Sequence, residues 1–190
     1  MSRRKKKGQY GYRDRRRRLQ LAKVLLGAAM ILVQAGARGL TDNEAVKNIL
    51  TVMAVLSVLP TANAASPLLA SWKYRTPPPD FYERVDGERE KGLMLYDLIV
   101  TSREQIIPLD AVMVHPKGVY ALSGSEKLDV KKAEKYLNDT FKAHRLDPNV
   151  KIIREEQAFL NKLKNLGAAS EDQDDGSVEY AAGLLKNLSM

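Results

Sequence analysis

The strongest constraint in this sequence is a long run without a charged side chain, residues 48–72 (NILTVMAVLSVLPTANAASPLLASW). A helix over this run would extend about 37 Å at roughly 1.5 Å per residue, more than the bilayer's hydrocarbon core of about 30 Å. Trp72, Lys73 and Arg75 stand at its end, and such aromatic and cationic side chains anchor helices at the membrane interface. The run therefore predicts a transmembrane helix, kinked near its middle by Pro60.

A second apolar segment precedes this run, at residues 19–40. Its uncharged part, residues 24–37, is only as long as a buried or re-entrant helix. Lys23 and Arg38 lie near its ends, where long side chains reach the headgroups, and including them gives a helix of adequate length to span. With the polar link TDNEAVK between the two segments, we predict a two-helix transmembrane hairpin over residues 19–72. Whether its first segment spans fully stays open.

Two alternatives to the hairpin stay open. Ala62-Asn63-Ala64 matches the small-residue pattern of signal-peptidase sites, so cleavage near Ala64 would release an exported soluble domain. The charged stretch before it is far longer than that of a signal peptide and contains a second apolar segment, which argues against cleavage. The other alternative makes both segments core helices of a soluble protein, and the length of the uncharged run argues against that.

The net charge of +8 comes from the N-terminus. Residues 1–18 hold ten Lys and Arg and one Asp, whereas the rest of the chain holds 21 basic and 22 acidic side chains. By the positive-inside rule, this basic tail before the first span, with Lys73 and Arg75 after the second, predicts an inner-membrane protein with both termini in the cytoplasm. We expect the tail to contact anionic lipid headgroups rather than nucleic acid, because only Tyr10 and Tyr12 could stack on bases. The residues expected to set topology or contact lipid are Arg3, Arg4, Lys5, Lys6, Lys7, Arg15, Arg16, Arg17, Arg18, Trp72, Lys73 and Arg75.

A small soluble domain follows the hairpin. Residues 73–92 form a Pro-rich and then charged linker, predicted as a stiff spacer. Residues 93–167 predict the order βββαβα, with strands at 93–101, 106–114, 119–122 and 150–153 and helices at 129–146 and 155–166. Residues 168–190 are an acidic linker and a last helix, which we expect to dock on its own domain. The predicted fold is an N-terminal transmembrane α-hairpin plus a small α/β domain with a C-terminal helix.

The stretch DAVMVHPKGVYALSGS, residues 110–125, resembles the nuclease-related domain of the PD-(D/E)xK superfamily. In that family an Asp on one strand, a Pro-x-Gly turn and a Glu-x-Lys on the next strand build a metal site. Asp110, Pro116 and Gly118 match the first two parts. The resemblance implies two carboxylates that hold a divalent metal, which generates hydroxide and offsets phosphate charge.

The second half of that motif departs from the family. Ser123 and Ser125 stand where the Glu and the Lys belong, and neither can replace its counterpart. We therefore expect a shared sheet scaffold, with Asp110 as the single candidate for a catalytic residue. A metal-dependent nuclease-like enzyme with relocated catalytic residues stays open as an alternative, because Glu126 and Lys127 lie close by.

The basic start, the paired apolar segments, YDLIVTSRE, VHPKGVYA and DDGSVEYAAGLLKNLSM resemble uncharacterised two-span membrane proteins of gut Firmicutes, some labelled "O-linked GlcNAc transferase-like". That label implies a diphosphate site, but the Asp-x-Asp pattern, Asp172 to Asp174, lies in the acidic linker.

Other catalytic residue types are scarce. The chain has no Cys, and its two histidines, His115 and His144, are expected at the surface or on a helix face. We therefore expect no cofactor and no metal, and predict a non-catalytic, membrane-tethered binding or assembly module. A protein partner or self-association stays open.

Overall fold

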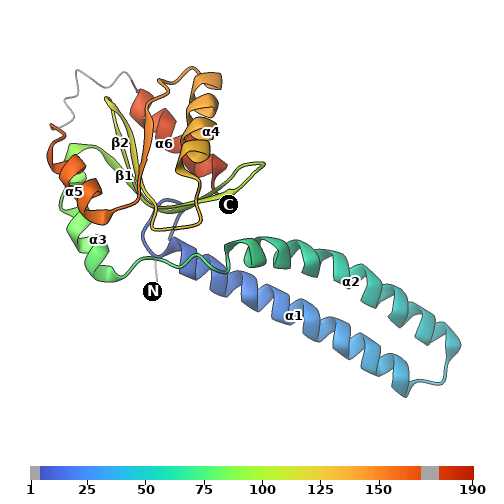
Figure 1. Ribbon diagram of the computed structural model, residues 1–190. Coiled ribbons are helices and arrows are strands. Elements are labelled where there is room, and N and C mark those ends of the chain that lie inside the picture. Colours follow the sequence, from blue (N-terminus) through green and yellow to red (C-terminus); the bar gives the residue numbers. More distant parts are fainter. Residues whose placement is uncertain (1–4, 168–175) are drawn as a thin grey trace. The chain divides into compact units, whose positions relative to one another are not determined.

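The computed structural model describes residues 5–167 and 176–190. The chain divides into two compact units (Figure 1). The helical hairpin comprises Asp14–Lys73, and the α/β unit combines Met1–Arg13 with Tyr74–Met190. The α/β unit is therefore built from both flanks of the hairpin, and the whole hairpin separates its N-terminal segment from the rest along the chain.

The hairpin consists of helix α1, Tyr12–Leu40, and helix α2, Glu44–Ser71. The link between them is shorter than predicted, because Asn43 caps α2 by accepting bonds from Ala45 N at 2.9 Å and Val46 N at 3.4 Å. Contacts between the helices fix an antiparallel pairing. Arg17 lies over the Trp72 ring at 4.2 Å, the Gly27 backbone packs against Thr61, and the Gln34 amide contacts the Ser57 hydroxyl at 3.5 Å.

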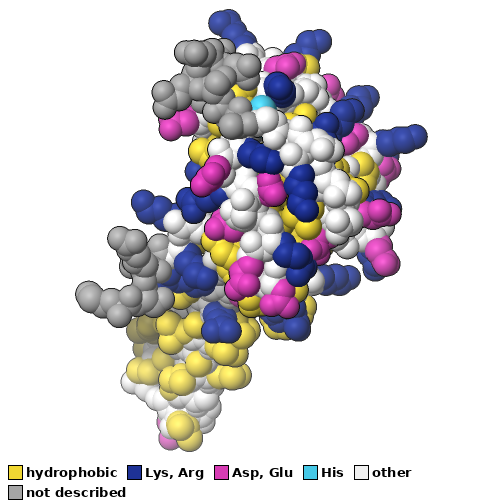
Figure 2. All heavy atoms as spheres, turned by 90° about the vertical axis from the view of Figure 1, so that its left-hand side faces the viewer, with side chains coloured by type: hydrophobic (Ala, Val, Ile, Leu, Met, Phe, Trp, Pro, Cys, Tyr) yellow, Lys and Arg dark blue, Asp and Glu magenta, His cyan; other side chains and the backbone are white. Residues whose placement is uncertain are grey.

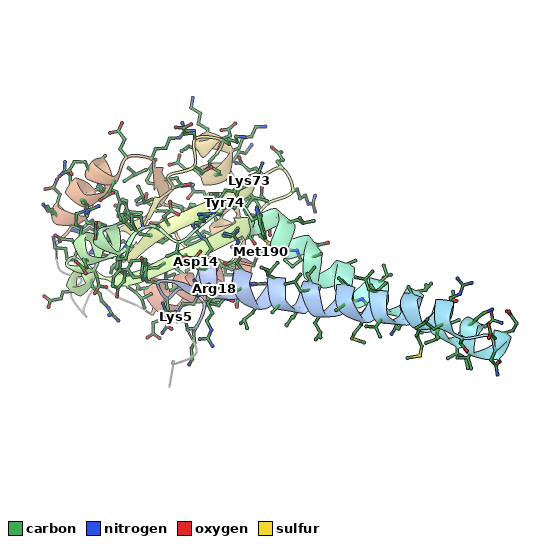
Figure 3. All side chains as sticks on the ribbon, turned by 90° about the horizontal axis from the view of Figure 1, so that it is seen from below. Lys5, Asp14, Arg18, Lys73, Tyr74 and Met190 are labelled. Carbon is green, nitrogen blue, oxygen red and sulfur yellow. The ribbon has the colours of Figure 1, made fainter. Side chains whose placement is uncertain are left out.

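The outer surface of the hairpin is apolar. Both helices are long and apolar enough to cross a membrane, and almost none of either apolar window is buried. Figure 2 shows hydrophobic side chains gathered over the hairpin, and Figure 3 shows side chains projecting outward along it. Leu32 and Leu59, for example, are each 71% exposed. Core helices of a soluble protein would be covered, so the structure favours the predicted hairpin over that alternative. The helix α2 continues through Pro60 and Pro67.

The α/β unit contains a four-stranded sheet in the order β1-β2-β3-β4. The first three strands are antiparallel neighbours, and β4 pairs parallel with β3 after the crossover helix α4. The strands are β1 Leu93–Thr101, β2 Ile106–His115, β3 Gly118–Leu122 and β4 Val150–Ile153. The predicted βββαβα order is confirmed, and the strand bounds agree closely with the prediction.

Helices cover both faces of this sheet (Figure 1). One face carries α4, Val130–Ala143, and α6, Ser177–Leu188, whose apolar side chains join one core cluster. The other face carries α3, Pro79–Asp86, and α5, Glu156–Lys164, whose side chains join a second cluster. The predicted docking of the last helix on its own domain is confirmed, because Leu185 is fully buried in the first cluster.

The linker at residues 73–92 differs from the predicted spacer, because it contains α3 and a short 3-10 helix, Arg89–Lys91. Phe81 and Val85 stand one helical turn apart, so they lie on one face of α3, and both are buried in the second core cluster. The prolines that suggested an extended spacer instead start a helix, since Pro79 occupies its first position.

Both edges of the sheet have hydrogen-bond partners. On β4, Val150 N donates to Asn138 Oδ1 at 2.8 Å and Ile152 N donates to Glu134 Oε1 at 2.8 Å, both side chains belonging to α4. On β1, Tyr96 N donates to Gly8 O at 2.9 Å, and Ile99 O accepts from Met190 N at 2.9 Å. These contacts protect the edges from pairing with a strand of another chain.

Candidate functional site

The most unusual site in the α/β unit is a gap in the ladder between β1 and β2. The pairing passes from Tyr96–Ala111 directly to Leu98–Leu109, so Asp97 and Asp110 face each other without a regular pair. Asp97 has φ +58°, a left-handed conformation that reverses which side chains face each core. Leu95 and Leu98 therefore lie in the same core cluster, although strict alternation would separate them.

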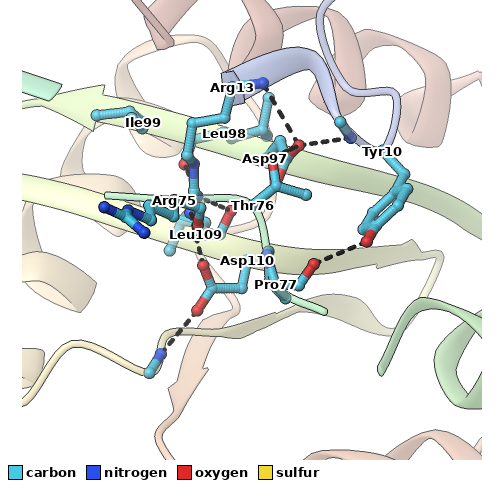
Figure 4. Close-up of polar contacts among 12 residues, drawn as sticks. Tyr10, Arg13, Arg75, Thr76, Pro77, Asp97, Leu98, Ile99, Leu109 and Asp110 are labelled. Atoms are coloured by element: carbon cyan, nitrogen blue, oxygen red, sulfur yellow. Dashed lines mark hydrogen bonds and ion pairs between the residues drawn. The ribbon is translucent and has the colours of Figure 1, made fainter. Parts of the chain in front are cut away.

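The guanidinium of Arg13 fills this gap (Figure 4). Its Nη2 donates to Leu98 O and to Leu109 O, each at 3.1 Å, and so satisfies two carbonyls at the interruption of the ladder. Its Nη1 donates to Asp110 Oδ1 and to Arg75 O, each at 2.8 Å. Arg13 is only 5% exposed, so this charge is removed from water and compensated by these bonds. We call Arg13, Asp97 and Asp110 the arginine clasp.

Asp97 caps the first turn of α1. Its Oδ2 accepts from Gly11 N at 2.7 Å, from Arg13 N at 3.4 Å and from the Thr76 hydroxyl at 2.8 Å. A carboxylate at a helix N-terminus satisfies free N–H groups and complements the helix dipole. Burial raises the pKa of Asp97, while the nearby Arg13 charge and these hydrogen bonds oppose the increase. One side chain of β1 thus holds the N-terminal segment at the point where α1 begins.

The contacts of the arginine clasp bear on whether Asp110 is available to bind a metal ion. Asp110 Oδ1 pairs with Arg13, and Oδ2 accepts from Gly124 N at 2.9 Å, so both oxygens have donors. Ser123, in the place of the family's Glu, is fully buried and its hydroxyl has no partner among the described residues. The described residues contain no group of three His, Asp or Glu that could hold a metal. The donor set here does not fit a divalent metal, and Arg13 supplies the cation that the acids face.

The N-terminal segment, residues 5–13, reaches the clasp through two turns. Gly8 and Gly11 have φ of +85° and +78°, a region that favours glycine. Between them, Tyr10 stacks on Tyr82 at 4.5 Å between ring centroids and donates from its hydroxyl to Pro77 O at 2.7 Å. This segment is therefore part of the folded unit, whereas the predicted tail treated residues 1–18 as one basic extension.

The aromatic contacts of Tyr10 and Tyr82 continue to a tyrosine of β1. Tyr82 meets Tyr96 at 5.0 Å in an edge-to-face arrangement, and the Tyr96 hydroxyl donates to Asp86 at 3.0 Å. Burial raises the pKa of Tyr96, with a further increase from Asp86. Tyr10, one of the two tyrosines considered for base stacking, is thus packed against protein.

The remaining expected contact residues lie in several places. Arg3 and Arg4 are outside the described residues. Lys7 Nζ donates to Ser189 O at 2.6 Å, which ties the N-terminal segment to the end of α6. The side chain of Arg17 packs on Trp72, and Arg75 contributes its carbonyl to the clasp. Asp172 and Asp174 also fall outside the described residues.

The histidine prediction was wrong for His115. This residue is 3% exposed at the end of β2, where its Nδ1 accepts from Lys117 N at 3.0 Å and its Nε2 lies 3.3 Å from Gly167 O. These partners fit the neutral ring with the proton on Nε2. Burial lowers the pKa of His115. His144 is exposed, as expected, and contacts the Tyr180 hydroxyl at 3.3 Å.

Arg13 was not predicted from the sequence, where it counted as one more charge of the tail. The sequence signal for the arginine clasp came from its acidic residues rather than from Arg13. Asp97 and Asp110 each stand alone in an apolar strand, LMLYDLIVT and IIPLDAVMV, and a buried carboxylate requires a cation or several donors. Nothing in the sequence indicated which of 31 Lys and Arg would supply it.

No protein-family model, curated protein or solved structure matches this chain. The fold and the site therefore define the class by themselves: an apolar two-helix hairpin attached to a four-stranded α/β unit that is closed by the segment preceding the hairpin. The resemblances to two-span Firmicutes proteins and to the nuclease-related domain stay predictions.

Proposed function

We propose that this protein is a two-span bacterial inner-membrane protein that carries its α/β unit on the cytoplasmic side as a non-catalytic binding or assembly module. The apolar outer surface of the hairpin supports the membrane part, because so large an exposed apolar area is expected to face lipid. The engaged state of Asp110 supports the non-catalytic part, because its two oxygens are already bonded to Arg13 and Gly124.

One observation carries the topology. The N-terminal segment and residues 74–190 belong to one compact unit, tied together by Arg13 and Tyr10. This supports a topology in which the two flanks of the hairpin lie on the same side of the membrane. An even number of spans follows, and a single span that separates the flanks would leave Asp97 and Asp110 without Arg13.

The charge distribution indicates on which side of the membrane these flanks lie. Ten Lys and Arg lie within residues 1–18, before the apolar part of the hairpin, and Lys73 and Arg75 lie just after the second apolar run. Positive residues that flank a short hairpin stay in the cytoplasm. The same charges attract anionic lipid headgroups, at about 1 kcal/mol for each basic residue near the surface. We assign Lys5, Lys6 and the four arginines 15–18 to this role, and leave Arg13 out because it is bound in the clasp.

The exported alternative fits the structure less well. Ala62-Asn63-Ala64 lies inside α2, and cleavage there would remove the whole N-terminal segment. The released domain would lose the Gly8 pairing with β1 and the Arg13 guanidinium, and would retain two carboxylates facing each other.

Single-cysteine variants test the proposed topology without background, because the natural chain has no Cys. Asp42→Cys lies between α1 and α2, and Lys127→Cys lies in an exposed loop after β3. We expect a membrane-impermeant maleimide to label Asp42→Cys in intact spheroplasts and Lys127→Cys only after permeabilisation. Labelling of Lys127→Cys in intact spheroplasts would contradict the proposal.

A further inference from the structure

A groove lies between the loop that joins β1 to β2 and one side of α4. Its volume is about 680 Å³, within the range of roughly 300–1,000 Å³ typical of ligand sites. The residues that matter for recognition are Arg103, Glu104, Lys132, Lys135, Tyr136 and His144. The lining residues on α4 follow the i, i+3, i+4, i+7 spacing of one helix face and so form one stripe along the helix: Lys132, Lys135, Tyr136, Asp139, Thr140 and Ala143.

The walls of this groove are fixed by hydrogen bonds. Gln105 donates from its side chain to Asp129 O at 2.9 Å and accepts from Asp129 N at 3.1 Å, which joins the loop to the start of α4. Ser102 closes the loop by accepting from Gln105 N at 3.0 Å. The Tyr136 hydroxyl donates to Thr101 O at 3.4 Å. A groove with walls joined in this way needs little ordering when it binds a partner.

The lining of this groove holds three cations and two acids, a net charge of +1. Lys132 pairs with Glu104 at 3.2 Å, but within the described part of the chain neither Arg103 nor Lys135 has an ion-pair partner. Further exposed cations flank the stripe on α4 and just after it, at Lys131, Lys142 and Arg145. Asp139 is the other acid of the lining. Residues 74–190 hold 17 Lys and Arg and 20 Asp and Glu, so these cations are a local feature of the groove and its rim.

The lining distinguishes among anionic partners. Tyr136 and Ala143 provide apolar surface between the cations, which suits side chains of a peptide. Glu104 and Asp139 would repel a continuous phosphate backbone, whereas a peptide of mixed charge can place Lys or Arg beside them. The edges of the sheet are already bonded, so a partner is expected to dock through side chains rather than by adding a strand.

We propose that this groove binds an acidic segment of a partner protein, with Arg103 and Lys135 as its main charge contacts and Tyr136 as its apolar floor. The inference deepens the proposed function, on which it rests, by naming the class of partner that the module takes.

The test uses the full chain in phosphatidylcholine nanodiscs on an array of random dodecamer peptides. We expect the bound peptides to be enriched in Asp and Glu. In the double variant Arg103→Gln/Lys135→Gln, binding should weaken roughly two- to fivefold for each cation removed, the range for exposed charge pairs. The matched control Lys151→Gln/Lys164→Gln removes two exposed lysines outside the groove and should bind like the natural protein.

Three results would overturn the inference: a bound set without acidic enrichment, equal losses in both double variants, or competition by oligo(dT) but not by the strongest acidic peptide. Near-UV circular dichroism of each variant separates lost binding from lost fold. The cysteine labelling described above is independent of the groove. If the cysteine labelling gives the proposed topology but the bound peptides are not enriched in Asp and Glu, only this inference is contradicted. If the labelling gives a different topology, the proposed function is contradicted.

Discussion

Two ion pairs of the α/β unit use similar chemistry in opposite surroundings. Arg13 and Asp110 meet at 2.8 Å with side chains only 4% and 18% exposed, whereas Lys132 and Glu104 meet at 3.2 Å with side chains 63% and 69% exposed. Water screens the second pair and can replace either partner. It cannot do so for the first, because removal of one partner leaves a buried charge. The difference separates a contact that closes the fold from one that tunes a surface.

Removal of Arg13 should have the largest effect. Arg13→Ala leaves Asp110 and two backbone carbonyls without their donor, and we expect a loss of about 3–5 kcal/mol in unfolding free energy. Thermal unfolding in detergent, followed by the near-UV signal of the tyrosines, measures the change. Arg18→Ala is the matched control, because Arg18 is exposed and carries the same charge. Equal losses in the two variants would show that the clasp contributes nothing specific.

A smaller loss of unfolding free energy is expected for Asp97→Asn, which keeps the shape of the side chain but removes its charge. In Asp97→Asn the side-chain oxygen can still accept from Gly11 N and Thr76, and Asn tolerates the left-handed backbone. Charge-assisted bonds become neutral ones, which costs on the order of 1 kcal/mol.

Asp97→Ala should lose more than Asp97→Asn, because it removes the acceptor for the first turn of α1 and places a residue less tolerant of positive φ. The two variants are compared by the same thermal unfolding. A loss in Asp97→Asn as large as that in Asp97→Ala would mean that charge, and not the acceptor, is what the cap requires.

His115 extends the comparison to a buried group that is neutral. Burial lowers its pKa below the ordinary 6.5, so the folded protein disfavours protonation. The stability contributed by the neutral ring is present above about pH 6.5 and is lost as the pH falls through the lowered pKa. Between pH 7.5 and 5, the natural protein should therefore lose more thermal stability than His115→Gln. Parallel pH profiles for the two proteins would contradict this assignment.

The sequence predicted elements far better than it predicted the clasp. Apolar runs and helical periodicity are local, and they located both long helices, all four strands and the docking of Leu185. The clasp depends on contacts between distant parts of the chain, which join Arg13 to Asp97 and Asp110. Among ten similar basic residues at the N-terminus, only tertiary packing distinguishes Arg13. The prediction of an extended spacer at residues 73–92 was wrong for a related reason, since Pro79 permits a helix start as readily as an extended chain.

The exposed pair should show the smallest effect and completes the comparison. Lys132→Gln and Glu104→Gln, alone and together, form a double-mutant cycle, for which we expect a coupling of about 0–1 kcal/mol that declines with added salt. The reason is that each side chain remains hydrated when its partner is absent. A coupling near that of a buried pair would mean that the loop at residues 102–105 shields the two charges from water. The groove beside α4 would then contain a fixed charge pair, and Arg103 and Lys135 alone would determine its affinity for acidic peptides.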